Sequence, residues 1–384
     1  MSRTQRPRRP QRPISLNLFA IFAFPFGRKA VIHPISHQHT SVSQECSRKG
    51  ISIFAWQHLG VQRDISSSRV SSEPIDVVYT WVDDQWPGYR DLLAQYAADG
   101  HDRNPNRTRD NLDLLKFSLR SLERYVPWVR RVFLVTARPQ TPSWLNRDAV
   151  HLVHHDELMA TAMLPTFNSF AIVSHLHRIS GLSNRFVYVE DDCLFGSTVH
   201  PVDFFDVSGR PRVFLKWRHS IGPERRGDGR LSPWNRALAL SNHLLNRRYG
   251  NKRRRTVNHA PLSVDGEAWR RMIGIWPEAF DQTASRFRAT GNVAPEHLYS
   301  HFLLEEETGI EVDAATSLRH AAYHALNNVI VYQRLNLVRL RVQRPRFCCM
   351  NDNYGGDPNP RSVSIVRGFL NRMFPQPSRF ESCR

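Results

Sequence analysis

A buried strand that ends on three consecutive carboxylates is the feature that most constrains the fold of this chain. Residues 186–189 read Phe-Val-Tyr-Val, and Glu190, Asp191 and Asp192 follow directly. Four β-prone residues in a row are typical of a strand buried on both faces of a parallel sheet. Its carboxyl end would lie at the sheet edge where α/β folds bind ligands. Clustered carboxylates favour a hard cation, so the pattern predicts an Mg²⁺ or Mn²⁺ site, with an acidic turn as the alternative.

Short apolar segments alternate with helical patterns around this strand, which predicts an α/β fold with a mainly parallel sheet. Further strands are predicted at 75–82, 132–136, 150–153 and 213–215, and helices at 112–125 and 170–179. After about residue 218 the chain is predicted to be mostly helical, with helices at 234–245, 267–273 and 296–306 and a strand at 328–339.

Composition and charge limit the class of protein and its location. The 384 residues are 41% apolar and 10% aromatic, as in a globular protein, and the formal charge is +18. Five cysteines without framework spacing fit a reducing compartment, and no run is long enough to span a bilayer. We therefore expect a cytoplasmic protein, with peripheral membrane contact through the basic stretch 1–13 and the apolar stretch 16–26 as one option. A poorly ordered extension or a signal peptide are the alternatives for that segment.

Changes in composition divide the chain into five predicted parts. Residues 1–72 form a basic, poorly ordered extension, and 73–217 the α/β part that carries the predicted metal site. A basic insertion occupies 218–256, a helical part 257–355, and a loosely packed tail rich in Pro and Arg 356–384.

Four segments together form a pattern that extends beyond single motifs. They are 75–83 (IDVVYTWVD), 109–196, 257–261 (VNHAP) and 349–352 (CMND). The longest contains SLRS at 118–121, LPTFNS at 164–169 and EDD at 190–192. In content and order these segments resemble the Stealth family of sugar-1-phosphate transferases. The resemblance covers roughly residues 74–355 and implies a nucleotide-sugar transferase sheet of GT-A-like type. It also implies that 73–217 bind the nucleotide-sugar and the metal and that 257–355 complete the active site.

The resemblance also implies a reaction. The family transfers a sugar 1-phosphate from a UDP-sugar to a hydroxyl of an acceptor glycan, which forms a phosphodiester and releases UMP. Such phosphoryl transfer depends on positioning and on neutralising charge at the phosphate oxygens. The chain lacks the large inserted modules of the eukaryotic enzyme, which favours a bacterial polysaccharide acceptor in capsule or exopolysaccharide synthesis.

Catalytic and metal-binding roles follow for residues that match the family's motifs. The resemblance assigns Asp191 and Asp192 to the metal. Asp352 would be a further ligand or hold the acceptor, with a structural turn as the alternative. The resemblance also assigns His259 as the general base, since histidine titrates near working pH, with His155 as a weaker alternative.

The remaining matches concern the nucleotide and its phosphates. Arg288 would clamp the diphosphate, or form an ordinary surface ion pair. Asp76, Trp81 and Asp83 would bind the nucleotide, Asp83 as part of the catalytic set; the alternative is a core tryptophan with Asp83 capping a turn.

Three polar residues on the predicted helices complete the expected site. Asn168 and Ser169 are placed at a helix start that favours anions, and Arg120 either contacts substrate or buttresses the sheet. Residues 112–117 lack a glutamate that eukaryotic members carry there, which leaves Asp113 as its possible substitute.

Two other functions compete with this interpretation. A metal-dependent glycosyltransferase of the same sheet type would use the same acidic cluster but release UDP. A protein that binds nucleic acid or a membrane surface would use the +18 charge and the basic run at 247–255. No nucleic-acid-binding motif accompanies that charge, so we expect no nucleic-acid partner. The sequence indicates no oligomeric state.

Overall fold

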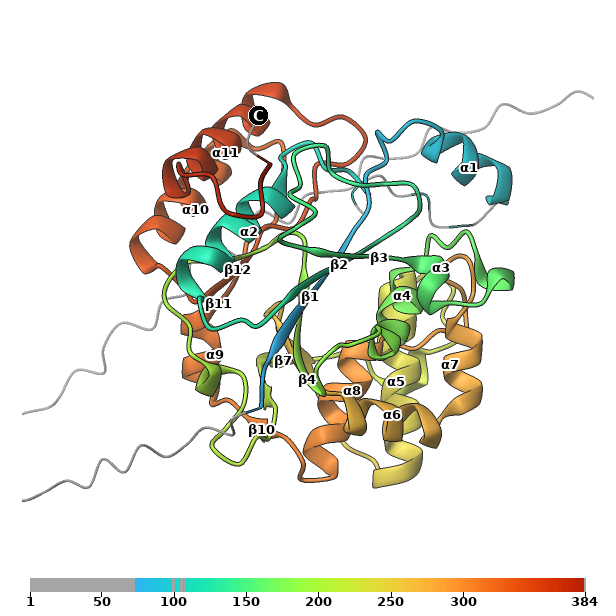
Figure 1. The fold of residues 1–384 in the computed structure, drawn as a ribbon. Helices are drawn as coiled ribbons and strands as arrows, with labels where there is room; N and C mark the ends of the chain where they lie inside the picture. The colour runs from blue at the N-terminus through green and yellow to red at the C-terminus, as the bar shows by residue number, and fades with distance from the viewer. Residues whose placement is uncertain (1–72, 99–100, 102, 104–105, 107, 383–384) are drawn as a thin grey trace, which may run out of the picture. The chain divides into compact units, whose positions relative to one another are not determined.

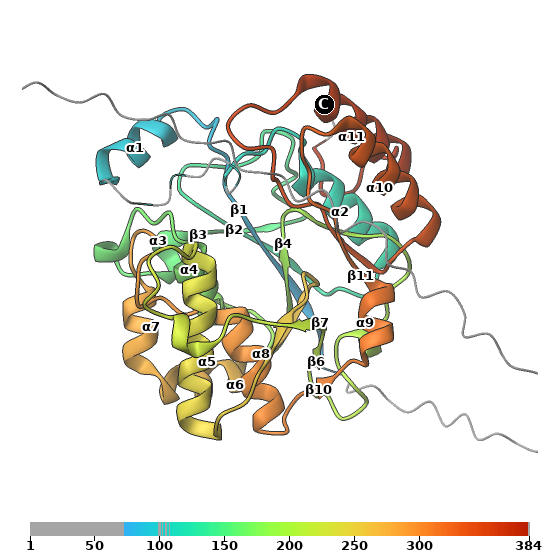
Figure 2. The same ribbon diagram turned by 180° about the vertical axis from the view of Figure 1, so that it is seen from behind.

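A five-stranded sheet lies at the centre of the computed structural model, which describes residues 73–98, 101, 103, 106 and 108–382 (Figures 1 and 2). Its strand order is β3-β2-β1-β4-β9. The first four strands run parallel, and β9 is antiparallel to β4. These strands are β1 (Asp76–Trp81), β2 (Val132–Thr136), β3 (His151–His154), β4 (Arg185–Glu190) and β9 (Leu262–Asp265). The predicted α/β fold with a mainly parallel sheet is therefore confirmed.

Each face of this sheet is covered by its own set of helices. Side chains alternate along β1, so Val78 joins a core that includes Trp269, while Val77 and Tyr79 pack on the opposite face with Leu119. In Figures 1 and 2, α4, α6 and α8 lie on one side of the sheet and α2 on the other. The helices up to α8 are α1 (Tyr89–Tyr96), α2 (Leu114–Tyr125), α3 (His155–Leu158), α4 (Ser169–His175), α5 (Pro233–Tyr249), α6 (Gly266–Ile275), α7 (Pro277–Thr283) and α8 (Pro295–Glu305).

A second, three-stranded sheet brings a late segment, residues 347–349, next to the residues that follow the central strand β4. Its order is β11-β12-β5, with β11 (Ala321–Tyr323) parallel to β12 (Phe347–Cys349) and β12 antiparallel to β5 (Cys193–Phe195). Because β5 follows β4 almost directly, the acidic cluster lies at the junction of the two sheets. The Met350 amide donates to the carbonyl oxygen of Asp192 over 2.8 Å. Two-stranded pairs are formed by β6 (Arg212–Val213) with β10 (Ile310–Glu311) and by β7 (Leu215–His219) with β8 (Arg255–Val257).

The part after residue 218 is mostly helical, as predicted, with α5, α6 and α8 at the expected positions and α9 at Ala314–His320. The predicted strand at 328–339 was wrong, because these residues lie in helix α10 (Ile330–Gln343). Its buried side chains, Gln333, Leu337 and Leu340, follow a helical spacing that the many valines and leucines obscured.

The predicted loosely packed tail was also wrong. Helix α11 (Pro360–Met373) contacts α10. Its Val366, Phe369 and Leu370 are buried in the same core cluster as the buried leucines of α10. The divisions predicted at 217, 256 and 355 stay predictions, and the extension 1–72 lies outside the described residues. No helix within the described part of the chain is long and apolar enough to cross a membrane.

Candidate functional site

A cleft of about 420 Å³ opens at the carboxyl ends of β1 and β4. Parallel strands bring their carboxyl ends to one edge, which places Trp81 of β1 beside the residues that follow β4. Loops from the later part of the chain complete the walls. Of the residues predicted for the site, seven line this cleft: Trp81, Ser169, Asp191, Asp192, His259, Arg288 and Asp352.

Negative charge is concentrated where β4 ends. Burial raises the pKa of Asp191 well above its usual value, and the neighbouring Asp192 and Asp110 raise it further. The pKa of Asp192 is raised to about 7, again chiefly by burial. A side-chain amide of Asn351 lies 3.4 Å from the Asp192 carboxylate. These oxygen donors fit the hard Mg²⁺ or Mn²⁺ ion expected from the sequence, which commonly needs only one or two carboxylates from the protein.

Asp352 lines the cleft but is engaged by a residue that the sequence interpretation did not single out. Nη1 of Arg109 lies 3.3 Å from Oδ2 of Asp352, and the Tyr354 amide donates to Oδ1 over 2.9 Å. Burial raises the pKa of Asp352. Among the described residues, Asp191, Asp192 and Asp352 do not form a group of three with ligand atoms within 4.8 Å.

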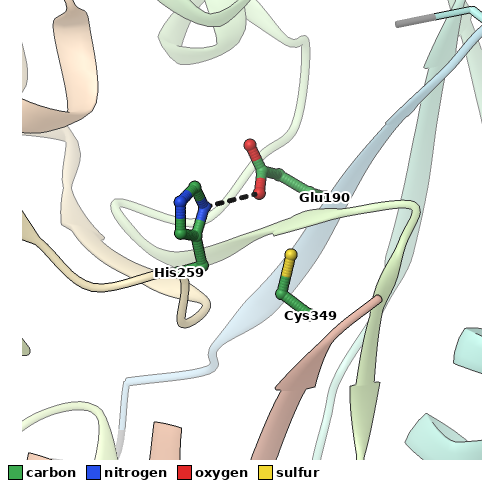
Figure 3. Close-up of side chains that lie close together, drawn as sticks. All are labelled: Glu190, His259 and Cys349. Carbon is green, nitrogen blue, oxygen red and sulfur yellow. Dashed lines mark ion pairs between the residues drawn. The ribbon is translucent and has the colours of Figure 1, made fainter. Parts of the chain in front are cut away.

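A different trio does meet this distance: Glu190, His259 and Cys349 (Figure 3). Nδ1 of His259 lies 3.9 Å from Oε2 of Glu190, and its ring packs against Tyr323 with centroids 4.7 Å apart. Burial raises the pKa of the Cys349 thiol well above its usual value, so the sulfur is a neutral S–H that faces Asp192 at 3.5 Å. A histidine held by a carboxylate in a cleft is an arrangement suited to general base catalysis.

His155, the weaker alternative base, also lines the cleft. It is buried at the start of α3, and burial lowers its pKa to about 4. The imidazole is therefore neutral at physiological pH, as is required of a proton acceptor. Its Nε2 atom has no hydrogen-bond partner among the described residues, whereas Nδ1 of His259 faces Glu190.

Arg288 reaches the cleft from the loop between α7 and α8. Its guanidinium lies over the Phe170 ring, 4.1 Å from the centroid, and donates to the hydroxyl of Ser169. Asn168 caps helix α4 through the Phe170 amide and also donates to the carbonyl oxygens of Thr283 and Ser285. Asn168 is fully buried and thus fixes the loop that carries Arg288, rather than facing the cleft itself.

Two other predicted residues are placed away from the cleft. Asp76 begins β1, at the opposite sheet edge, where Arg130 donates to its carboxylate over 2.8 Å and the Ser183 amide over 2.8 Å. Arg120 donates through Nε to Glu381 over 2.8 Å and through Nη1 to the Phe374 carbonyl over 2.9 Å. The structure therefore corrects the expected position of Asp76, which ties two strand starts together, whereas Arg120 takes the second of its two expected roles and buttresses the fold.

Asp83 and Trp81 follow the alternative that the sequence left open. Oδ1 of Asp83 accepts the Gln85 amide over 2.9 Å, so Asp83 caps the turn after β1 and is not among the residues that line the cleft. Trp81 is buried yet lines the cleft, and its indole N–H donates to Asp110 over 2.8 Å.

Glu296 is a site residue that sequence reasoning missed. It lies in the first turn of α8, and it lines both the main cleft and a smaller side pocket beside Trp234 and His259. Its Oε2 atom is buried and accepts no hydrogen bond from any described residue. Burial raises its pKa to about 7, and the nearby Glu190 adds to the shift. The glutamate at a helix start looked like an ordinary first-turn acid, and only the tertiary fold buries it.

Comparisons with known proteins match three conserved regions of one family, in order along this chain. Stealth protein conserved region 2 matches residues 107–213, conserved region 3 matches 258–305, and conserved region 4 matches 338–383. An exopolysaccharide phosphotransferase of Streptomyces coelicolor is 35% identical over 80% of this chain and 52% of its own length. The capsular polysaccharide phosphotransferase SacB of Neisseria meningitidis serogroup A is 30% identical over 80% of this chain and 57% of its own.

The chain thus spans between about half and three fifths of the length of these relatives. A solved structure, the galactosyltransferase LgtC with donor and acceptor sugar analogs, covers 79% of this chain and 96% of its own. The TM-score is 0.37 at 11% identity, which is too low to support an inference about activity.

Proposed function

The chain belongs to the Stealth family, and on that premise we propose that it transfers a sugar 1-phosphate from a UDP-sugar to a hydroxyl of a polysaccharide acceptor. The observation that carries the proposal is one cleft lined by the acidic pair after β4, by His259 and by Arg288. Phosphoryl transfer needs charge neutralisation, a cationic clamp and a proton acceptor, and these residues can supply each. The products are a sugar-phosphate diester and UMP.

In the proposed reaction the acceptor oxygen attacks the β-phosphorus of the UDP-sugar. A new O–P bond forms, the P–O bond to the α-phosphate breaks, and UMP leaves with that bridging oxygen. The anomeric C–O bond of the sugar stays intact. His259 takes the proton of the acceptor hydroxyl, and Glu190 at 3.9 Å stabilises the resulting imidazolium.

Asp191 and Asp192 would hold Mg²⁺ or Mn²⁺, which when bound neutralises charge on the phosphate oxygens. Arg288 is placed to bind the diphosphate, because Phe170 and Ser169 fix its guanidinium at the rim of the cleft. An arginine so restrained loses little side-chain entropy when it grips a phosphate bidentately. Trp81, with its indole N–H bound to Asp110, offers the nucleotide a rigid wall.

The test is the identity of the nucleotide that is released. Purified protein is incubated with UDP-N-acetylglucosamine or UDP-glucose, with Mg²⁺ or Mn²⁺, and with a panel of glycan acceptors. UMP that appears only with metal and acceptor would support the proposal. UDP instead would identify a glycosyltransferase that attacks the anomeric carbon, and the proposed transfer of phosphate would be rejected.

A further inference from the structure

Helix α10 carries an apolar stripe on its outer face. Val331, Leu335, Val338 and Val342 are 67%, 67%, 62% and 77% exposed. They are spaced four, three and four residues apart, which places them on one face of a helix. The opposite face of α10 is buried in the core through Leu337 and Leu340. The helix is therefore apolar on two sides, and only one of them is covered by the described part of the chain.

Positive charge surrounds this stripe without any acidic counterpart. Four exposed arginines flank it, and residues 330–346 contain neither Asp nor Glu. The neighbouring α11 repeats this composition with three exposed arginines and no acid in Pro360–Met373. The two helices lie side by side at the outside of the fold in both Figure 1 and Figure 2. The exposed arginines are Arg334, Arg339, Arg341 and Arg344 on and after α10, and Arg361, Arg367 and Arg372 on α11.

We propose that this face, defined by the α10 stripe and its flanking arginines, lies on the surface of an anionic phospholipid bilayer. A helix parallel to the interface buries an apolar face among the lipid chains while arginines on its flanks reach the phosphate headgroups. Each arginine near an anionic surface adds a favourable electrostatic contribution, whereas an acidic residue would oppose it. The 14 residues of α10 lie along such a surface rather than crossing it.

Charge also disfavours two other candidates for what covers this face, namely a second copy of the chain and the segment 1–72. A second copy packed on the same stripe would bring arginine against arginine, with no carboxylate on α10 or α11 to pair with them. The segment 1–72 contains eleven Arg and Lys residues against two acidic ones, so it too would be repelled. A phosphate-bearing surface is complementary in both charge and polarity.

The position of α10 relative to the cleft gives the proposal a functional meaning. The helix begins a few residues after Leu326, whose amide donates to the Asn351 carbonyl over 2.8 Å at the cleft wall. A bilayer that holds α10 would therefore keep the cleft close to the membrane surface. The inference itself concerns binding to lipid and stands independently of the reaction proposed above.

Co-sedimentation of the full chain with vesicles tests this directly. We expect binding to vesicles that contain phosphatidylglycerol, weakened by added salt, and little binding to pure phosphatidylcholine. The variant Val331→Ser, Leu335→Ser, Val338→Ser and Val342→Ser should bind at least about tenfold more weakly. So should Arg334→Gln with Arg339→Gln and Arg341→Gln. The matched control, Leu92→Ser with Val207→Ser, removes exposed apolar side chains elsewhere and should bind as the wild type does.

Circular dichroism and thermal melting would verify that each variant is folded. A fluorophore on Val338→Cys gives a second readout, and its emission should shift to shorter wavelength when anionic vesicles are added. Unchanged vesicle affinity in the serine variant, or a fluorophore that stays in water while the chain binds, would reject the proposal. So would a concentration-dependent dimer that the serine substitutions abolish in a chain that binds no vesicles.

Discussion

Nδ1 of His259 lies 3.9 Å from a carboxylate oxygen of Glu190, although the two residues come from different elements of the fold. Glu190 ends the central strand β4, and His259 lies in the short loop between β8 and β9. Desolvation alone would raise the pKa of Glu190, but His259, together with the charges of Arg288 and Lys216, holds that pKa below its usual value. The carboxylate is thus kept ionised beside the imidazole, which is the charge state that a general base requires of its partner.

Replacing His259 tests its role as the base. We expect His259→Ala to lower kcat by about 10² to 10⁴ while the fold is kept, because this is the usual contribution of a positioned base. Glu190→Gln should lower kcat less and change the pH dependence of kcat. The measurement is UMP release across pH. The control is His200→Ala, an exposed histidine that does not line the cleft. A His259→Ala enzyme with wild-type kcat at every pH would remove the assignment.

Replacing Asp192 tests the metal site with a readout separate from turnover. We expect Asp192→Asn to abolish turnover and to weaken Mn²⁺ binding at least about tenfold. Even the loss of a group that only orients a metal ligand has an effect of that size. Titration calorimetry with Mn²⁺ gives the affinity. Asp148→Asn changes an exposed carboxylate that does not line the cleft and should leave the Mn²⁺ affinity unaltered. Equal Mn²⁺ affinity in Asp192→Asn and wild type would exclude Asp192 as a ligand.

The Arg120–Glu381 pair distinguishes a structural role from contact with substrate. Both side chains are largely buried, so Arg120→Ala leaves a carboxylate without its partner and should lower the free energy of unfolding by about 3 kcal/mol. The KM for the UDP-sugar should not change. Arg138→Ala breaks the exposed pair with Asp156 and should cost less than about 1 kcal/mol. Urea denaturation gives both values, and a raised KM with unaltered stability would instead support substrate contact, the other option left open by the sequence.

Glu296 predicts how stability depends on pH. Its pKa in the fold is about 7, against 4.5 for an ordinary glutamate, so the folded state binds this proton more tightly than the unfolded chain. Stability from this group is present below pH 4.5 and is lost as the pH rises through 7. Because glutamine does not ionise, Glu296→Gln should not show this decrease in the free energy of unfolding. Between pH 4.5 and pH 8 its stability relative to wild type should therefore rise by on the order of 3 kcal/mol.

Urea unfolding at the two pH values measures that difference. Glu278→Gln, in the exposed first turn of α7, serves as the matched control and should keep a constant offset from wild type. If the difference in free energy of unfolding between Glu296→Gln and wild type is the same at both pH values, the prediction is wrong. Ionising the Glu296 carboxyl would then not destabilise the fold.

Sequence reasoning succeeded where a local pattern determines the structure. Four β-prone residues before Glu190 were enough to predict a buried central strand, and the strands of the α/β part lie where expected. It also brought His259, Arg288 and the acidic pair into one site, because these residues match family motifs. Membership of the Stealth family, inferred from those motifs, is confirmed by the matches to three conserved regions.

It failed where contacts between distant segments decide a residue's role. Asp76 was assigned to the nucleotide, and substrate contact was one of two options for Arg120, but their partners Arg130 and Glu381 are set by the tertiary fold. Asn168 was correctly placed at a helix start, yet its amide holds a loop over a hundred residues away instead of an anion. Glu296 shows the converse, since burial that no local pattern reveals gives an ordinary acid an unusual environment. The strand predicted for α10 failed because valine and leucine lie on both faces of that helix.

The junction between the two sheets has a consequence for how the protein is made. The wall of the cleft at Asn351 and Asp352 exists only once β12 has paired with β5, and β12 follows β5 by more than a hundred residues. The acidic pair emerges from the ribosome much earlier, at the end of β4. A nascent chain therefore cannot complete this cleft until β12 has left the ribosome, and the acidic pair has no wall at Asn351 and Asp352 while the intervening residues are being made.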